Sequence, residues 1–243
     1  MSSTYGDVDR SGDPAGAAAW MDEMATWPAV QAYKDRTVEL LADISPLLDV
    51  GCGVGTDARA LGAVGIDPSF TMTREALRRG GVFLRGDVLA LPVASGALGG
   101  VRTDRVLQHV DDATDALSEL SRVLRPGGRA VLAEPDQTTL VIDGPDAELT
   151  PAILAFRKAS INHASLGGEL AHRLRSMGYT DIAREPFPIE ILDPALAFGL
   201  PSWPGILVER GHWTRGEAQR FTHSLDPASF RYCFDIVVTT GLR

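Results

Sequence analysis

The sequence has little of what marks secreted, membrane-spanning or nucleic-acid-binding proteins. Its two cysteines, Cys52 and Cys233, are too few for a disulfide framework or a zinc cluster. No apolar run is long enough to span a membrane, and the polar start MSSTYGDVDRSGDP lacks the apolar core of a signal peptide. Basic residues number 23 against 32 acidic ones, and the formal net charge of −9 argues against a general nucleic-acid binder. We therefore expect a cytoplasmic protein with neither a nucleic-acid nor a membrane partner.

What the sequence does contain is the composition of an ordinary globular core. Hydrophobic residues make up 44% of the 243 positions, enough for one α/β domain with an added lid or for two small domains. Strand and helix patterns alternate from about Leu47 to Gly178, which implies a parallel sheet covered on both faces. The clearest helix runs from Asp112 to Leu124, where apolar residues recur at helical spacing. Thr150 and Pro151 are expected to be the N-cap and first residue of a later helix.

Two segments flank this alternating region and are expected to cover it. Two predicted helices precede the first strand, so they should pack on the edge of the sheet or over its top. The longest connection between strands, Pro194 to Pro227, is rich in aromatic residues, which is typical of a packed insertion over a pocket. We therefore expect an N-terminal helical cap over residues 1–45 and a core over 46–243, with an inserted lid at about 193–228.

The stretch LLDVGCGVG, Leu47 to Gly55, predicts a ligand-binding turn. A short buried strand runs directly into three alternating glycines, and glycine lets a backbone approach a ligand closely because it has no Cβ. Asp67 ends the next apolar run, where an acid can accept hydrogen bonds from a ribose. The usual dinucleotide fingerprint, G-x-G-x-x-G with an acid about twenty residues on, is not matched. A tight strand–helix turn without a ligand is the alternative.

Further motifs follow in order along the chain. GDVLALP (residues 86–92) follows the third predicted strand, VLQHVDD (106–112) the fourth, and SRVLRPGGRAVLAEPD (121–136) joins the best helix to the fifth. With the glycine stretch, these motifs make the region from Leu47 to Asp136 resemble the class I S-adenosylmethionine-dependent methyltransferases, especially the small-molecule enzymes of ubiquinone and menaquinone biosynthesis. The resemblance implies a doubly wound, Rossmann-like α/β fold with a seven-stranded sheet, an antiparallel last strand and helical lid elements.

The resemblance also implies S-adenosyl-L-methionine as the cofactor and assigns residues to it. The glycine loop would back its methionine part, Asp67 would bind the ribose hydroxyls, and Asp87 with Val88 would lie at the adenine. One departure is the short segment between Gly55 and Asp67, which clips the first helix after the loop. The expected cofactor-binding residues are Arg36, Asp49, Gly51, Cys52, Gly53, Asp67, Pro68, Met72, Gly86, Asp87, Val88, Arg105 and Gln108.

Methyl transfer from a sulfonium needs geometry more than a nucleophilic side chain, because the methyl group is already activated. A base helps only when the acceptor must lose a proton, and His109 is the candidate, with a wall residue as the alternative. Four tryptophans in the flanking segments suggest an aromatic acceptor pocket, or simply lid packing. No acid or histidine stands at a spacing that supports a metal site, so we predict none. The expected substrate-binding residues are Tyr33, Trp20, Asp136, His163 and Trp203.

These patterns predict a methyltransferase that acts on a small molecule, such as a secondary metabolite or a quinone-like acceptor. Two rivals are kept. A nicotinamide-dependent oxidoreductase would leave the later motifs unexplained, and a non-methylating cofactor-binding protein or cyclase on the same fold would retain Asp67 and Asp87. The acceptor, the atom methylated and the oligomeric state, including a homodimer, are left open by the residues.

Overall fold

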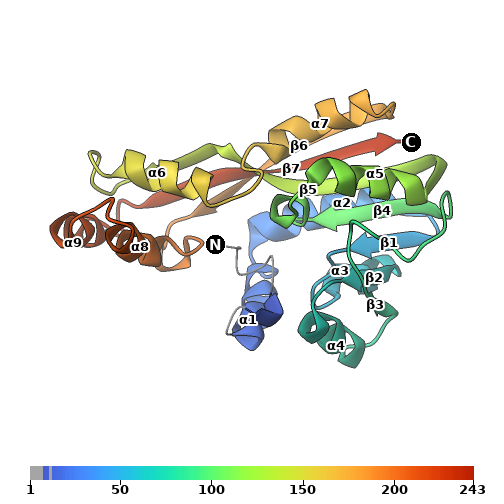
Figure 1. Cartoon of the computed structure of the whole chain (residues 1–243), viewed down its shortest axis with the longest axis horizontal. Helices are drawn as coiled ribbons and strands as arrows, with labels where there is room; N and C mark the ends of the chain where they lie inside the picture. Colours follow the sequence, from blue (N-terminus) through green and yellow to red (C-terminus); the bar gives the residue numbers. More distant parts are fainter. Residues whose placement is uncertain (1–7, 11–12) are drawn as a thin grey trace.

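The computed structural model describes residues 8–10 and 13–243, and its centre is one seven-stranded sheet (Figure 1). The strand order is β3-β2-β1-β4-β5-β7-β6. Strands β1 to β5 pair in parallel, and β7 runs antiparallel to both β5 and β6. The doubly wound α/β fold and the antiparallel last strand are therefore confirmed. The strands are β1 (Leu47–Val50), β2 (Val64–Asp67), β3 (Phe83–Arg85), β4 (Leu98–Asp104), β5 (Leu124–Asp143), β6 (Thr180–Ile191) and β7 (Arg231–Leu242).

Helices connect the strands and cover both faces of the sheet. The α-helices are α1 (Pro14–Met24), α2 (Pro28–Leu41), α3 (Thr56–Leu61), α4 (Phe70–Arg78), α5 (Ala113–Val123), α6 (Thr150–Ala159), α7 (Leu166–Ser176), α8 (Trp203–Glu209) and α9 (Arg215–His223). The short 3-10 helices are η1 (Val8–Arg10), η2 (Leu107–His109), η3 (Pro194–Leu196) and η4 (Leu200–Ser202). Among these described helices, none is long and apolar enough to cross a membrane.

Side-chain caps define where the helices begin. Asp112 accepts hydrogen bonds from the first turn of α5, so the helix predicted over 112–124 is confirmed within a residue at each end. The predicted N-cap at Thr150 is wrong, because Thr150 is already the first residue of α6. Its hydroxyl donates to the Asp146 backbone carbonyl at 2.8 Å, while the Asp146 side chain accepts from the backbone N–H of Glu148 at 3.0 Å. A turn around Asp146 therefore opens this helix.

The two leading helices divide their roles. The expectation that both would lie at the edge or top of the sheet is wrong for α2. That helix lies across one face, where Val30, Tyr33 and Leu41 enter the larger apolar core together with residues of β5 and β7. Helices α5 and α7 cover the opposite face and close a second core. Helix α1 is different, because it packs on α4 beside the glycine loop.

The connection between β6 and β7 forms a helical insertion, as expected for residues 194–227. It contains η3, η4, α8 and α9, which lie beside α6, where β6 ends and β7 begins (Figure 1). Phe198 joins it to the N-terminal segment, because its ring lies 6.2 Å from Trp27 and 6.1 Å from Tyr232. The division into a cap over 1–45 and a core over 46–243 stays a prediction, and residues 1–7 and 11–12 lie outside the described part.

Candidate functional site

The loops after β1, β2 and β3 are tied together by backbone hydrogen bonds. The N–H groups of Gly51 and Cys52 donate to the Ile66 carbonyl at 2.7 and 3.0 Å. The N–H of Gly53 donates to Asp67 Oδ2 at 2.8 Å, and the N–H of Gly86 donates to the Asp67 carbonyl at 3.1 Å. The glycine loop, the acid at the end of β2 and the loop after β3 thus form one continuous edge of the sheet. This is where ligands bind in open α/β sheets.

The glycines of this edge are required by backbone conformation and by packing. Gly51, Gly53 and Gly55 have φ angles of +70°, +52° and +76°, which other residues rarely adopt. A Cβ on Gly51 would lie 2.2 Å from the side chain of Val106, in the loop after β4. The β1 and β4 loops therefore touch through Gly51, so the ends of the two central strands are closely coupled.

Asp67 is held firmly in place at the end of β2. It is 8% exposed, and its Oδ1 accepts the N–H of Ser69 at 2.9 Å. Burial raises the pKa of Asp67, against the opposing effect of its two backbone hydrogen bonds. Each carboxylate oxygen accepts one protein N–H and keeps a second lone pair. The side chain is thus pre-oriented and can still accept hydrogen bonds from a ligand.

Two pieces of the N-terminal segment close over this edge. The Asp9 carboxylate accepts the N–H groups of Phe70 and Thr71 at the start of α4, at 2.7 and 3.1 Å. Burial would raise the pKa of Asp9, but these bonds and one from Ser69 lower it to about 2. Helix α1 is anchored to α4 by the Asp22–Arg79 ion pair at 2.7 Å. The sequence patterns did not indicate Asp9, because no local spacing links it to a helix about 60 residues away.

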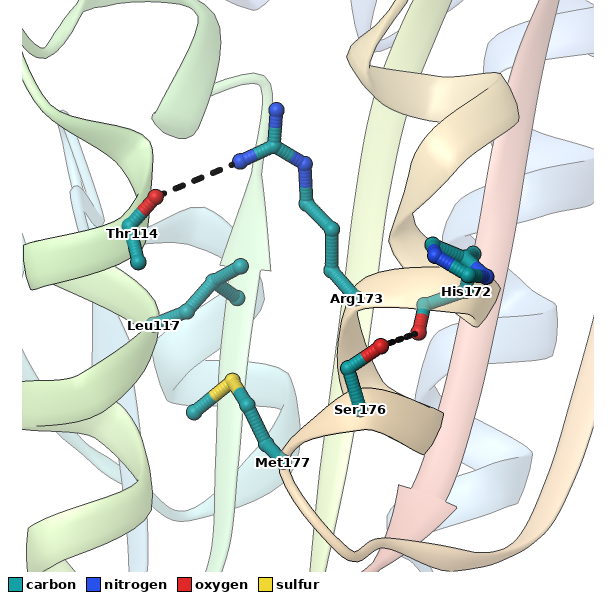
Figure 2. A pocket seen from close by; sticks show the side chains of 6 residues that line it. All are labelled: Thr114, Leu117, His172, Arg173, Ser176 and Met177. Carbon is teal, nitrogen blue, oxygen red and sulfur yellow. Dashed lines mark hydrogen bonds between the residues drawn. The ribbon is translucent and has the colours of Figure 1, made fainter.

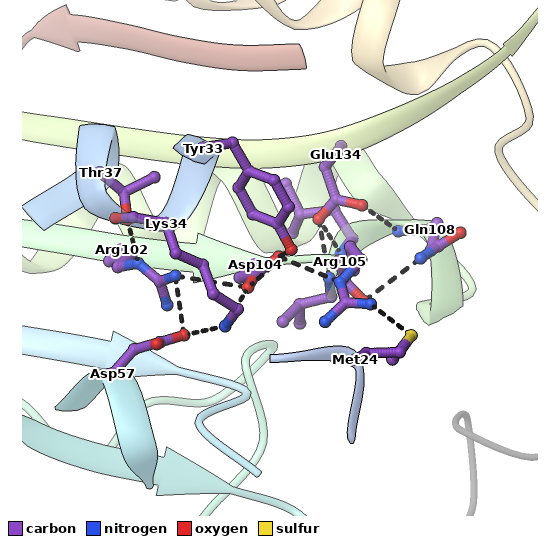
Figure 3. Close-up of polar contacts among 12 residues, drawn as sticks. Met24, Tyr33, Lys34, Thr37, Asp57, Arg102, Asp104, Arg105, Gln108 and Glu134 are labelled. Atoms are coloured by element: carbon purple, nitrogen blue, oxygen red, sulfur yellow. Dashed lines mark hydrogen bonds and ion pairs between the residues drawn. The ribbon is translucent and has the colours of Figure 1, made fainter. Parts of the chain in front are cut away.

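A buried charge network lies directly beneath the loops (Figure 3). Its centre is Arg102 of β4, which is 2% exposed and contacts Asp49 at 3.0 Å, Asp57 at 2.9 Å and Asp104 at 3.3 Å. Lys34 of α2 contacts both Asp57 and Asp104. These five residues, together with Arg105, which lies 3.2 Å from Asp104, form what we call the charge network. The network contains three acidic and three basic side chains, so its formal charges sum to zero.

The charges in the network set the protonation of its acids. Burial raises the pKa of Asp49 to about 6, although Arg102 opposes the shift. Asp104 is also buried, but Lys34, Arg105 and Arg102 hold its pKa far below the usual range. Asp49 Oδ2 is buried and has no hydrogen-bond partner. Beside the glycine loop, this orphan acceptor could receive a donor from a ligand.

Glu134, at the end of the first stretch of β5, organises the loop after β4. It is completely buried, and its carboxylate accepts the backbone N–H groups of Val106, Leu107 and Gln108 at 2.8, 2.7 and 3.3 Å (Figure 3). Burial raises the pKa of Glu134 to about 8, despite these three donors. The side chain therefore caps η2, the helix that ends at His109. The sequence patterns did not indicate this role.

Replacing Glu134 with glutamine is expected to change how stability depends on pH. The pKa of the carboxyl group is higher in the folded protein, about 8, than its ordinary value of 4.5. Its contribution to stability is therefore complete below about pH 4.5 and is lost as the pH rises toward 8. Glutamine does not titrate. Urea unfolding from pH 5 to 8 should show E134Q gaining stability relative to the wild type as the pH rises.

The matched control for this prediction is Glu119→Gln. Glu119 also accepts a backbone N–H, from Leu91 at 2.7 Å, but its hydrogen bonds to Arg122 lower its pKa. Its contribution is therefore lost only below the ordinary pKa, and the difference between E119Q and the wild type should stay flat from pH 5 to 8. Parallel pH profiles for E134Q and the wild type would contradict the role of Glu134 as a titrating group.

The chain matches known proteins over this same region. Residues 48–132 match a family described as "Methyltransferase domain". This match covers the glycine loop, Asp67 and the loop carrying His109. Residues 48–132 therefore carry a methyltransferase domain.

Relatives and solved structures agree with the methyltransferase domain. The chain is 41% identical over 178 residues to an uncharacterized 37.1 kDa protein in transposon TN4556 of Streptomyces fradiae, which covers 66% of this chain and 51% of that protein. It is 39% identical over 95 residues to demethylmenaquinone methyltransferase of Beutenbergia cavernae, covering 36% and 40%. The chain thus spans about half or less of the length of these relatives. The YcgJ protein of Bacillus subtilis shares the fold, with a TM-score of 0.63 and 18% identity over 88% of this chain and 98% of that one.

Most residues assigned to the cofactor lie along one edge of the methyltransferase domain, at the carboxyl ends of β1 to β4 and in the loops and first turns that follow. Cys52 packs against the core of Ala58, Ala76 and Phe83, and burial raises the pKa of its thiol, so it is a packing residue. The residues brought together there are Asp49, Gly51, Cys52, Gly53, Asp67, Pro68, Met72, Gly86, Asp87, Val88, Arg105 and Gln108.

Arg36 does not join this edge of the methyltransferase domain. It lies on α2 and forms an ion pair with Glu185 of β6 at 2.7 Å and with Glu39 at 3.2 Å. Strand β6 is the last strand at the far side of the sheet from β3. The Arg36 guanidinium therefore pairs with acids at the other side of the sheet, and we leave Arg36 out of the proposed pocket.

Three residues assigned to the substrate have structural partners in the methyltransferase domain. Tyr33 is fully buried, and its hydroxyl donates to Asp104 at 3.1 Å. Asp136 accepts the N–H of Thr138 at 3.0 Å in the irregular part of β5, so it forms a turn. His163 Nε2 lies 3.0 Å from the Val110 carbonyl and braces the loop after β4. These contacts favour positioning over proton transfer.

The remaining assigned residues are aromatic and lie in the flanking segments. Trp20 packs edge-on against Trp27 at 5.5 Å, and Trp203 packs against Phe156 of α6 at 6.0 Å. Trp203 is 5% exposed. Trp20 and Trp27 are connected through Phe198 to β7, whereas Trp203 lies beside α6.

A surface groove lies elsewhere, between α5 and α7 (Figure 2). Its lining residues are Thr114, Leu117, His172, Arg173, Ser176 and Met177. None of the loop residues described above lines it. Within the described ranges, no group of three His, Cys, Asp or Glu side chains could hold a metal ion.

Proposed function

We propose that this protein binds S-adenosylmethionine at the edge formed by the β1, β2 and β3 loops and transfers its methyl group to a small molecule. The observation that carries the proposal is the position of Asp67. Its side chain is bonded to Gly53 and its main chain to Gly86, so one residue links the glycine loop to the loop carrying Asp87. The match to the methyltransferase domain over residues 48–132 supports the same cofactor.

The residues at this edge suit the chemistry of the cofactor. Asp67 keeps acceptor capacity for ribose hydroxyls, and Asp49 has an unpartnered buried oxygen beside the glycine loop that can accept from an ammonium group. Asp87 is exposed at the end of β3 and follows the tied Gly86. When bound, the cofactor supplies a methyl group activated by its sulfonium. The protein then has to hold the acceptor in line with that methyl and exclude water.

His109 is our proposed general base. It ends η2, the turn that Glu134 fixes by accepting three backbone N–H groups. Burial and the positive charges of Arg105 and Arg157 lower its pKa to about 4, so the imidazole is neutral at pH 7. A neutral imidazole can accept a proton from an acceptor hydroxyl as the methyl group is transferred.

The names of relatives are consistent with a hydroxylated or quinone-like acceptor. Among them are a demethylmenaquinone methyltransferase of Beutenbergia cavernae and an O-methyltransferase of Pyrenophora dematioidea, the latter 32% identical over 136 residues, which is 47% of this chain and 51% of that protein. The aromatic residues of α1, α2 and the β6–β7 insertion would provide the apolar walls that such an acceptor needs.

Calorimetry tests the proposal directly. We expect the wild type to bind S-adenosylmethionine and S-adenosylhomocysteine and not NAD, and Asp67→Asn to lose most of that affinity, because an amide places a donor against one of two N–H groups. His109→Ala should bind the cofactor as the wild type does. Incubation of the wild type with methyl-labelled cofactor and a cell extract should label a small molecule, and H109A should not.

Binding of NAD without binding of S-adenosylmethionine would overturn the proposed function. Cofactor binding without any labelled product would favour a non-methylating protein.

A further inference from the structure

One cation at the lid end of the domain has no counter-ion. Arg157, on α6, is only partly exposed, and its guanidinium forms no ion pair with an acid in the described part of the chain. Its Nε is buried without a partner. The group lies over the ring of Trp203, with the guanidinium carbon 5.4 Å from the ring centre. A partly buried guanidinium normally pairs with an acid, so this one has donors to spare.

An unpartnered hydroxyl group lies next to this cation. Tyr232 of β7 is completely buried, and its Oη forms no hydrogen bond. Burial raises its pKa, but the charge of Arg157 and the hydrogen-bonding approach of its guanidinium oppose the shift, so the two side chains are close neighbours. Buried tyrosine hydroxyls usually find a partner. The Arg157 guanidinium and the Tyr232 hydroxyl therefore lie side by side, and no acid in the described part of the chain pairs with either of them.

These two donors lie close to the proposed site of chemistry. The charge of Arg157 acts on His109 as well as on Tyr232. The surroundings are aromatic, because Phe198 packs on Tyr232 at 6.1 Å and Trp203 packs on Phe156 at 6.0 Å. One cation without an acid partner, one buried hydroxyl and several aromatic rings thus lie close together.

We propose that Arg157 and Tyr232 bind a carboxylate of the methyl acceptor, whose aromatic or apolar body packs against Trp203 and Phe198. This inference rests on the proposed methyltransferase function and names its substrate class. The planar guanidinium fork matches a carboxylate. A single buried cation balances a monoanion, whereas a phosphate group carries about two charges at neutral pH. The carboxylate also explains why the protein itself supplies no acid for Arg157.

The test uses two pairs of probes that differ only in charge: benzoate with benzamide, and 2-naphthoate with 2-naphthamide. Each is titrated into the full-length protein saturated with S-adenosylhomocysteine, and binding is followed by tryptophan fluorescence. We expect at least one carboxylate to bind tenfold or more tightly than its amide. Arg157→Gln should abolish that preference, and Tyr232→Phe should weaken carboxylate binding severalfold with little effect on the amide.

The matched control is Arg210→Gln. Arg210 also stacks on an aromatic ring, 5.3 Å from the centre of Phe156, but it is exposed to solvent. The R210Q variant should therefore keep the preference for the carboxylate over the amide. Equal binding of acid and amide in both pairs, or no binding of either acid, overturns the proposal, and so does an R157Q variant that keeps the preference with an unchanged melting temperature. Failure of S-adenosylhomocysteine itself to bind would instead overturn the proposed function.

Discussion

Replacing Arg102 with leucine is expected to lower the free energy of unfolding by about 3–5 kcal/mol, the usual cost of removing one partner of a buried ion pair. Arg102 is 2% exposed and contacts Asp49, Asp57 and Asp104. Without it, these three acids would have only Lys34 and Arg105 to balance them. Hydrogen bonding cannot compensate, because leucine offers no donor to the carboxylates.

Chemical denaturation at pH 7 measures this loss, and Arg78→Leu is the control. Arg78 is 71% exposed and forms a surface pair with Glu75, so its removal should change stability little. The pH dependence gives a second check. Loss of Arg102 raises the pKa values of the neighbouring acids in the fold, so the difference from the wild type should shrink as the pH falls toward 5. If R102L were no less stable than R78L, the charge network would not hold the fold together.

Replacing Gly51 with alanine is expected to weaken binding of S-adenosylhomocysteine by roughly 10- to 100-fold, which corresponds to about 1.4–2.8 kcal/mol. Gly51 has a φ angle of +70°, and its new Cβ would lie 2.2 Å from Val106 Cγ2. The loop after β1 must therefore shift, and with it the Gly53 N–H that orients Asp67. Calorimetry on the folded variant measures the effect.

Two variants separate the clash from simple backbone strain. Gly62, at the end of α3, has a similar φ angle of +62°, but a Cβ there would meet nothing within 4 Å. Gly62→Ala should therefore cost some stability and leave cofactor affinity unchanged. Adding Val106→Ala to Gly51→Ala removes the atom that clashes and should restore part of the affinity. Equal losses of affinity in G51A and G62A would show that the loop position does not control binding.

Features set by short stretches of chain could be predicted from the sequence. Each of these features depends on residues that are close together in the sequence: the strand ending at Val50, the glycine turn, Asp67 and the helix over 113–123. The shortened first helix was also predictable, because the segment between Gly55 and Asp67 allows only α3, Thr56–Leu61. The antiparallel last strand came from the family resemblance, since spacing carries no information on strand direction.

Contacts between distant residues could not be predicted in the same way. Asp9 and Phe70, or Arg36 and Glu185, are joined only when the chain folds, and an arginine on a helix looks the same whether it faces a cofactor or an acid on the sheet. Glu134 could have been noticed as an acid that ends an apolar strand. Its three partners, however, lie more than 25 residues earlier in the chain.

The sequence by itself determined the glycine turn after a buried strand and the acid after the next strand, which form the proposed cofactor site, because both are set by local stretches of chain. Only the tertiary structure decided which charges are neutralised by the protein and which are left for a ligand. Arg102 and Arg157 are both arginines that the fold covers at least in part, yet three acids converge on the first and no acid of the described residues pairs with the second. That difference arises from the packing of β1, β4, α3, α6 and β7, because charge pairing depends on distances in space that no sequence pattern records.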